Sequence, residues 1–228
     1  MTRRSSLGLL PLLWLALWLL ASCGKDDDYY YPSVRFEFLT AHTGARGQLV
    51  EVRTDGGLLL PVAEDASGSL ARPDSTLRIV ANYELLGDVL AAPTGVKVWA
   101  VGSVVSPVPV PSVAFRDGVT TDPVRPLSLW LGLDYLNLVL EVEAQSGVHL
   151  FHFAQDSLRV SPSSGACDVW LTLYHDDGGD PQSYARRAYL SVPLRQYAVM
   201  GETVDLHFSI NTYSGLRTYD FRYTSVGE

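Results

Sequence analysis

The residues with the clearest potential for chemistry form one acidic loop, His175-Asp176-Asp177-Gly178-Gly179-Asp180. Asp176, Asp177 and Asp180 would offer carboxylate oxygens, and Ca²⁺ takes six to eight oxygen ligands. The loop lacks the spacing of an EF-hand and its closing glutamate. A plain turn between two strands would have the same composition. Both interpretations of Asp176, Asp177 and Asp180 stay open, and the sequence predicts no required cofactor.

No further group of residues has the pattern of a catalytic centre. The chain contains no G-x-S-x-G, H-E-x-x-H, P-loop or G-x-G-x-x-G motif. Glu141 and Glu143 share a strand face, where a solvated sheet surface accounts for them better than a glycosidase pair. His149 and His152, three apart on a strand, would point to opposite faces. Cys167 fits a small packed residue better than a thiol nucleophile. We therefore predict that the protein is not an enzyme.

The position of Cys23 indicates export and lipid attachment. Two arginines precede the apolar run Leu7–Ala21, which is as long as a signal-peptide core and shorter than the roughly 20 residues of a membrane span. Leu20-Ala21-Ser22-Cys23 then resembles a bacterial lipobox. Residues 1–22 are therefore a predicted signal peptide, and Cys23 is the predicted lipidation site that holds the chain to a membrane. An ordinary signal peptide followed by a chance cysteine is the alternative.

Residues 23–32 are a predicted acidic tether. Asp26, Asp27 and Asp28 follow the cysteine closely, and this run resembles the export signal of surface lipoproteins in Bacteroides-type bacteria. A solvated spacer would also be polar. We expect the protein on the cell outer membrane, lipid-anchored and facing the exterior.

Charge and composition exclude some partners. The net charge of −8 becomes −10 when Arg3 and Arg4 leave with the signal peptide. Only two lysines are present, so binding to phosphate backbones and nucleic acid is excluded. The apolar share of 47% is enough for a buried core, and 19 glycines and 13 prolines favour short strands over long helices.

Apolar and polar residues alternate along the first part of the exported chain, as in half-buried strands. Asp55-Gly56 predicts a hairpin turn. Val96, Val98 and Ala100 are expected on one face of their strand, opposite Lys97, Trp99 and Val101. The expected strands cover 33–39, 48–54, 58–62, 77–85 and 96–105. Five short strands suit a small OB-like barrel, which we predict over residues 33–112.

A proline-rich stretch then interrupts the pattern. Five prolines fall between positions 107 and 126, and proline cannot donate a hydrogen bond in a central strand. We expect the chain to cross between two domains at about Ser112–Asp122.

Alternation resumes over the second part of the chain. The expected strands include 136–142, 148–153, 168–174, 184–193, 204–210 and 219–223. Residues 148–153 are expected to pair with 136–142, and residues 184–193 with 168–174. We predict an antiparallel β-sandwich over residues 120–228, so the fold class is all-β, an OB-like barrel followed by a sandwich.

Three tryptophans of the exported chain, Trp99, Trp130 and Trp170, could stack on a sugar. Core positions account for aromatic residues in small β-domains better than a binding platform does.

The chain resembles the NigD-like lipoproteins of Bacteroides-type bacteria. The matching segments are Asp26–Pro32, Arg78–Tyr83, Asp122-Pro123-Val124, Trp130-Leu131, Tyr135–Leu138, His149, His175–Asp180 and Thr218–Phe221. The resemblance implies an N-terminal OB-like domain and a C-terminal β-sandwich. The family is named from a bacteriocin-associated locus, which hints at an immunity role for its members.

Two classes of function remain. The first is a surface lipoprotein that binds a protein, peptide or glycan without catalysis, including a bacteriocin-immunity role. The second is an enzyme that acts on an extracellular or envelope polymer. The lack of a nucleophile–base or metal pattern favours binding.

Overall fold

A computed structural model describes residues 33–88, 92–161, 166–198 and 203–224. The residues from Val34 onward form one compact unit. The predicted signal peptide, Cys23 and the tether lie outside the described residues. Within the described ranges, no helix has the length and apolar character needed to cross a membrane.

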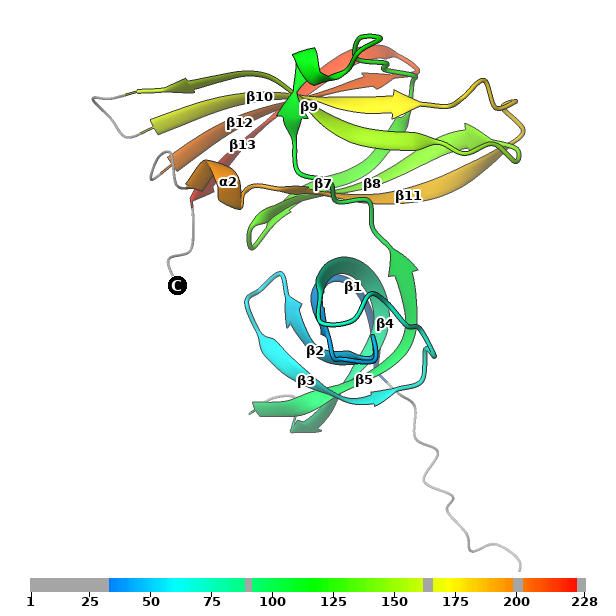
Figure 1. Cartoon of the computed structure of the whole chain (residues 1–228), viewed down its shortest axis with the longest axis vertical. Helices are drawn as coiled ribbons and strands as arrows, with labels where there is room; N and C mark the ends of the chain where they lie inside the picture. The colour runs from blue at the N-terminus through cyan, green and yellow to red at the C-terminus, as the bar shows by residue number, and fades with distance from the viewer. Residues whose placement is uncertain (1–32, 89–91, 162–165, 199–202, 225–228) are drawn as a thin grey trace, which may run out of the picture. The chain divides into compact units, whose positions relative to one another are not determined.

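The first part of the chain closes into a five-stranded barrel (Figure 1). Its strands are β1 (Val34–Thr43), β2 (Leu49–Thr54), β3 (Leu59–Asp65), β4 (Thr76–Asp88) and β5 (Ala92–Ser103). They follow the order β1-β2-β3-β5-β4, with β4 pairing back onto β1 and β3 parallel to β5. The barrel core contains Leu39, Ala41, Leu49, Val52, Leu60, Ile79, Ala81, Tyr83, Leu85, Val96 and Val98.

The prediction of which β5 side chains face the core is correct only as far as Val98. Tyr83 pairs with Val98 and Asn82 with Ala100, so the register shifts and Trp99 is an extra residue. Such a bulge reverses the side-chain alternation beyond it. Ala100 is therefore exposed and Val101 packs against the core, opposite to the sequence prediction.

The second part of the chain forms two packed sheets. One contains β7 (Arg125–Gly132), β8 (Tyr135–Ala144) and β11 (Tyr184–Pro193), in the order β11-β8-β7. The other contains β6 (Val110–Pro111), β9 (Leu150–Val160), β10 (Ala166–Asp176), β12 (Thr203–Thr212) and β13 (Gly215–Thr224), in the order β13-β12-β10-β9-β6. A 3₁₀ turn (Ser112–Ala114) and the short helix α2 (Arg195–Ala198) lie between strands.

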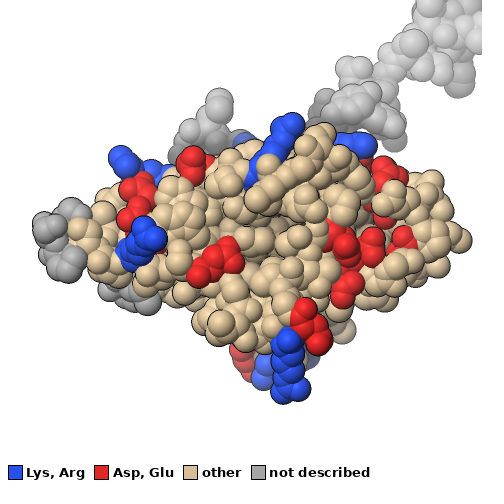
Figure 2. Space-filling view, turned by 90° about the horizontal axis from the view of Figure 1, so that it is seen from above, with Lys and Arg blue, Asp and Glu red and all other residues tan. Residues whose placement is uncertain are grey.

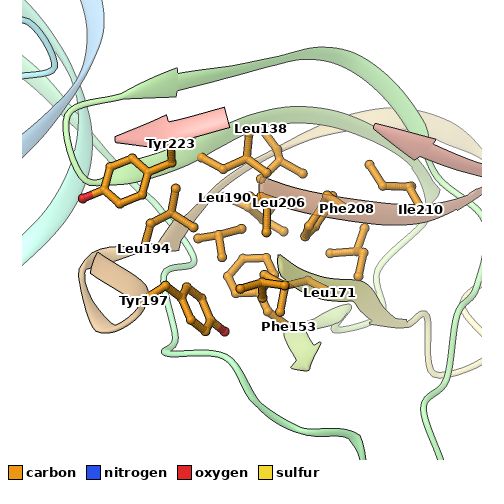
Figure 3. Packing of buried hydrophobic residues seen from close by; sticks show 14 of the residues in the cluster. Leu138, Phe153, Leu171, Leu190, Leu194, Tyr197, Leu206, Phe208, Ile210 and Tyr223 are labelled. Atoms are coloured by element: carbon orange, nitrogen blue, oxygen red, sulfur yellow. The ribbon is translucent and has the colours of Figure 1, made fainter. Parts of the chain in front are cut away.

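Side chains from both sheets meet in the core of this sandwich (Figure 3). Leu138 and Leu190 of the smaller sheet face Leu206 and Phe208 of the larger one, and all four are fully buried. The alternation predicted for 204–210 is confirmed, because Val204, Leu206, Phe208 and Ile210 all point inward. The all-β fold class is also confirmed.

Two predicted strand pairings are wrong. Residues 148–153 do not pair with 136–142, and 184–193 do not pair with 168–174. Instead β9 pairs with β10, while β8 pairs with β11 in the opposite sheet. The chain crosses between the layers after β8 and again after β10. Because β11 carries it through the opposite sheet, β12 returns beside β10 in parallel and not in antiparallel orientation.

The proline-rich segment joins the sandwich early. Val105 bridges to Leu190 of β11, and β6 pairs with β9 at the edge of the larger sheet. These pairings favour a boundary close to Ser103. The division into residues 33–112 and 120–228 stays a prediction.

We expect Leu206→Ala to lower the free energy of unfolding by about 2–5 kcal/mol, because it leaves a cavity between the two sheets. Ser209→Ala on the outer face of the same strand should cost less than about 1 kcal/mol. Urea denaturation of both variants measures the difference. Equal losses would show that the core does not lie between these sheets.

Candidate functional site

A buried arginine joins the barrel to the sandwich. The Arg78 side chain on β4 is 2% exposed. Its Nη2 donates to Asp55 Oδ1 at 2.5 Å and to Asn137 Oδ1 at 2.9 Å. Its Nε donates to Ser191 Oγ and its Nη1 to Thr40 Oγ1, both at 3.2 Å. One guanidinium therefore connects β1 and the β2–β3 turn of the barrel with β8 and β11 of the sandwich.

The partners of Arg78 also bond to one another. Asn137 Nδ2 donates to Asp55 Oδ2 at 2.7 Å, and Ser191 Oγ donates to Asn137 Oδ1 at 2.6 Å. Gly132 leaves room for this contact, because a Cβ there would lie 2.3 Å from Asp55 Oδ2. We call Arg78, Asp55, Asn137 and Ser191 the Arg78 network. Asp55 supplies the negative charge that a buried guanidinium needs.

Aromatic rings lie beside Arg78 and at other contacts between the barrel and the sandwich. The Arg78 guanidinium lies 4.3 Å from the ring centre of Tyr135, a cation–π distance. Phe38 of β1 meets Trp130 of β7 edge-on at 5.3 Å. Phe36 of β1 meets Tyr189 of β11 edge-on at 5.7 Å. Apolar contact thus reinforces the hydrogen bonds between the barrel and the sandwich.

A groove of about 480 Å³ runs beside the start of β1, within the usual size range of ligand pockets. We call it the β1 groove. Arg35, Phe36, Glu37, Phe38, Thr54, Asp55, Gly56, Leu58, Tyr83, Leu85, Trp130 and Val139 line it. Apolar and aromatic residues predominate. Asp55 belongs to both the groove and the Arg78 network.

One hydrogen bond fixes the polar groups inside the groove. The Tyr83 hydroxyl donates to Glu37 Oε2 at 2.8 Å. Burial and this bond to a carboxylate raise the pKa of Tyr83 to about 12. Tyr83 therefore stays protonated at neutral pH and holds the Glu37 side chain in place.

Arg78 also lines a second cavity, of about 750 Å³, with Tyr135 and Pro193 of the sandwich. Most of its other lining comes from barrel strands and the chain that leaves them. Leu70 and Val108 at this cavity are exposed. This cavity contains one aromatic ring, so the β1 groove is the better candidate for a specific contact.

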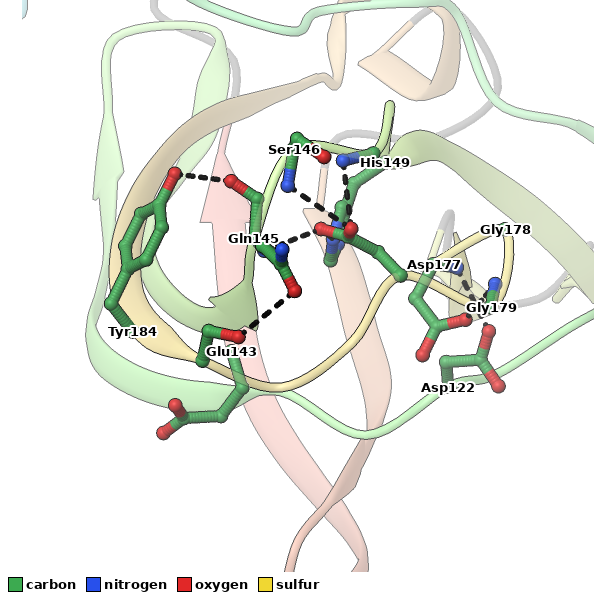
Figure 4. Close-up of polar contacts among 12 residues, drawn as sticks. Asp122, Glu143, Gln145, Ser146, His149, Asp177, Gly178, Gly179 and Tyr184 are labelled. Atoms are coloured by element: carbon green, nitrogen blue, oxygen red, sulfur yellow. Dashed lines mark hydrogen bonds and ion pairs between the residues drawn. The ribbon is translucent and has the colours of Figure 1, made fainter.

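The acidic loop is organised around Asp180 (Figure 4). Its carboxylate accepts hydrogen bonds from the backbone N–H groups of Gln145, Ser146 and Gly147 at 2.7, 3.1 and 2.8 Å. These bonds, that from Gln145 above all, lower the pKa of Asp180 to about 2. Asp180 thus fixes the turn that follows β8.

Two histidines continue from Asp180 into a hydrogen-bonded chain. His149 Nε2 lies 3.4 Å from Asp180 Oδ2, and His149 Nδ1 lies 2.9 Å from His175 Nε2. His175 Nδ1 faces the carbonyl oxygen of Asp122 at 3.0 Å and must donate to it. Burial lowers the pKa of His175, which favours a neutral ring whose Nε2 accepts from His149 Nδ1. His149 donates to Asp180 as well only when both of its ring nitrogens carry a proton. His149 thus lies just before β9 as a buried linker, not on an open strand face.

The three candidate calcium ligands of the loop, Asp176, Asp177 and Asp180, do not converge on one point. Asp176 and Asp177 lie near Asp122, with one carboxylate oxygen from each within 4.8 Å of the others. Asp180 is turned instead toward the backbone of residues 145–147. Asp122 Oδ2 accepts from the N–H of Asp177 at 2.9 Å. The sequence predicts no metal here, and calcium at this loop stays an untested alternative to a plain turn.

The other candidate residues that the structure describes take part in ion pairs or pack in the core. Arg125 pairs with Glu141 and lies 3.9 Å from Glu143, so both carboxylates face a cation. Cys167 is fully buried in the sandwich core, and burial raises the pKa of its thiol. Cys23 lies outside the described residues, and its lipidation stays a prediction.

The core interpretation of the tryptophans is wrong for Trp99 and Trp130, which are 38% and 36% exposed. Trp170 is half-buried and stacks on His207 at 4.8 Å. The three rings belong to β5, β7 and β10, which lie in three different sheets. They do not form one shared sugar-binding platform.

Charge does not mark a site on the face shown in Figure 2. Acidic and basic side chains there occur in small groups, with broad uncharged areas between them. A contact on this face would depend on shape and local pairing more than on a single-sign field.

The Arg78 network was missed at the sequence level. Arg78 alternates with apolar residues in its strand, as a solvent-facing residue would. A clue was available, because Arg78 and Asn137 both lie in segments that carry the family resemblance. The β1 groove had no comparable signal, since its lining comes from five separate segments of the chain.

The barrel, the sandwich and the groove beside them define an all-β protein with an aromatic-lined groove and a polar junction. Comparison then identifies its family. The profile described as the NigD-like C-terminal beta sandwich domain matches residues 106–223. The crystal structure of a NigD-like immunity protein from Bacteroides caccae is 34% identical, over 86% of this chain and 99% of that chain, with a TM-score of 0.70. The chain belongs to the NigD-like family.

Two more distant structures show the same fold. A protein from Parabacteroides distasonis, provisionally named as toxin-related, is 22% identical over 85% of this chain and 94% of that chain, with a TM-score of 0.68. A protein from Bacteroides fragilis, provisionally named a lipoprotein, is 12% identical over 86% and 100%, with a TM-score of 0.56. A search of curated proteins found no match.

We expect Arg78→Met to lower the free energy of unfolding by about 3–5 kcal/mol, because it leaves the Asp55 carboxylate without its cation and removes one hydrogen bond from Asn137 in a largely buried site. Arg78→Lys should not restore the loss, since an ammonium cannot reproduce the fork of donors. Chemical denaturation measures the effect. Arg46→Met, at an exposed turn, is the matched control. A loss for Arg78→Met no greater than that of the control would show that the network does not hold the junction.

The Asp180 carboxylate should stabilise the fold in a pH-dependent way. Its folded pKa of about 2 lies below its ordinary value of 3.8, so its charge stabilises the fold above pH about 4 and this contribution disappears as pH falls toward 2. Asp180→Asn should therefore lower the urea midpoint strongly near pH about 6 and much less near pH about 2.5. Asp117→Asn, in an exposed turn, should change neither midpoint. An equal loss for Asp180→Asn at both pH values would exclude a role for the charge.

Proposed function

We propose that this protein is a lipoprotein of the cell envelope that binds a partner without catalysing a reaction, in the manner of an immunity protein. The partner is a protein, peptide or glycan outside the cell. The observation that carries the proposal is the 34% identity to a NigD-like immunity protein over 99% of that chain.

The bonding of the polar groups supports binding over catalysis. Asp180, His149 and His175 are occupied with one another and with backbone groups. Among the described hydroxyl groups, Thr76 Oγ1 meets an imidazole, at 2.9 Å from His42 Nδ1. This pair lies on the barrel surface and has no carboxylate bonded to it within the described residues. A nucleophile activated by a histidine needs such an orienting group.

The proposed location of the protein in the cell envelope is inferred from its sequence. The signal-like run Leu7–Ala21 followed by Leu20-Ala21-Ser22-Cys23 supports lipid attachment at Cys23, and Asp26–Asp28 supports the outer face of the outer membrane. Two or more acyl chains would hold the protein at the membrane firmly. A protein held there could meet an incoming toxin before it reaches its target.

The test compares isogenic strains in co-culture with a bacteriocin-secreting competitor. We expect deletion of the gene to lower survival, wild type to restore it, and Cys23→Ala not to restore it. Mass spectrometry of the N-terminal peptide should show a lipid-modified Cys23 in wild type alone. Added protease should cut the wild-type protein on intact cells.

Several results would contradict the proposal. An unmodified Cys23 would exclude the anchor, and full protection from added protease would exclude the exterior location. Equal survival of all strains would remove the immunity role. Turnover of an envelope polymer that is lost when one carboxylate or histidine is replaced would favour the enzyme alternative.

A further inference from the structure

The first half of β1 has one free edge. Val34–Phe38 pairs with β4, from Val34 opposite Glu84 to Phe38 opposite Val80. On the other side, pairing with β2 begins only at Leu39, opposite Thr54. Among the residues that the structure describes, no strand pairs with that side of Val34–Phe38. The backbone N–H and C=O groups there form a template for another strand.

The β1 groove lies along this free edge. Arg35, Phe36, Glu37 and Phe38 line it from β1, while Leu58 and Trp130 come from other elements. Phe36 and Leu58 are 52% and 44% exposed, which is high for large apolar side chains. An apolar groove beside unpaired backbone groups matches the site that peptide-binding domains use for β-strand addition.

We propose that the β1 groove receives an extended peptide segment, which adds to the free edge of Val34–Phe38 as a further strand. This proposal rests on the binding role proposed above and names the class of partner. A glycan could stack on Phe36 and Trp130, but it lacks the regular row of amide donors and acceptors that this edge matches.

Charge indicates which peptide fits. Arg35 and Glu37 are two apart on β1 and share one face, while Phe36 lies on the other face with Trp130 nearby. A partner strand would therefore place an acidic and a basic side chain, two residues apart, opposite Arg35 and Glu37. Its alternate side chains would be apolar and enter the groove beside Phe36.

The probe is a set of synthetic, end-capped peptides of about seven residues, long enough to cover this edge. Val, Leu or Tyr alternates in them with Glu, Lys and Thr. Intrinsic tryptophan fluorescence of residues 24–228 reports binding, with Trp130→Phe to identify the responding ring. We expect peptides with Glu and Lys two apart to bind at least about tenfold more tightly than the same residues in helical spacing. Leu58→Asp should weaken binding by at least about tenfold, while Leu70→Asp, away from the groove, should not.

N-methylation of single peptide amides separates strand addition from simple apolar contact. We expect binding to be lost at alternate positions only, because alternate amides of an added strand face β1. Tolerance of N-methylation at every position, or equal binding by Leu58→Asp, would overturn the proposal. Binding by residues 33–228 but not by residues 24–228 would also overturn it, because the chain's own tether would then fill the groove. A further outcome separates the two proposals. If no peptide binds and the Leu58→Asp strain still survives in co-culture, the β1 groove is excluded as the binding site and the immunity role is not contradicted.

Discussion

The bonding of the Arg78 guanidinium is the constraint on which the rest of this structure depends. A buried cation costs several kcal/mol unless it is paired and its donors are satisfied. Here the partners are Asp55 and Thr40 from the barrel and Asn137 and Ser191 from the sandwich. Separation of the barrel from the sandwich would therefore expose this charge to solvent or leave it without its hydrogen-bond partners. A junction of this kind specifies one arrangement more strictly than apolar contact alone.

The β1 groove is a consequence of that junction. Asp55 holds Arg78 and lines the groove at the same time, and Trp130 reaches it from the sandwich. The end of β2 at Thr54 leaves the start of β1 without a second neighbour. A free strand edge is normally a liability for aggregation. Here it lies beside the sandwich and carries two opposite charges, which limits the strands that can add to it.

The sequence was sufficient for local structure where one face of a strand is buried. Val204–Ile210 alternate without interruption, and every apolar member is in the core. The bulge at Trp99 had no local signal, because it depends on the register of β4 against β5. Local sequence patterns also could not show to which sheet β9 and β11 belong. The same residue types occur in a turn within one sheet and in a crossing between two sheets. Asp180 shows the same limit, because its partners lie more than 30 residues earlier in the chain.

Amide hydrogen exchange in wild type and Arg78→Met, under conditions where both remain folded, tests most directly whether the Arg78 network holds the junction. If it does, exchange should become faster in β1 and β4 of the barrel and in β8 and β11 of the sandwich together. The amides of β12, in the sandwich core, should change little. Faster exchange confined to the barrel strands, or no change in either part, would contradict the account.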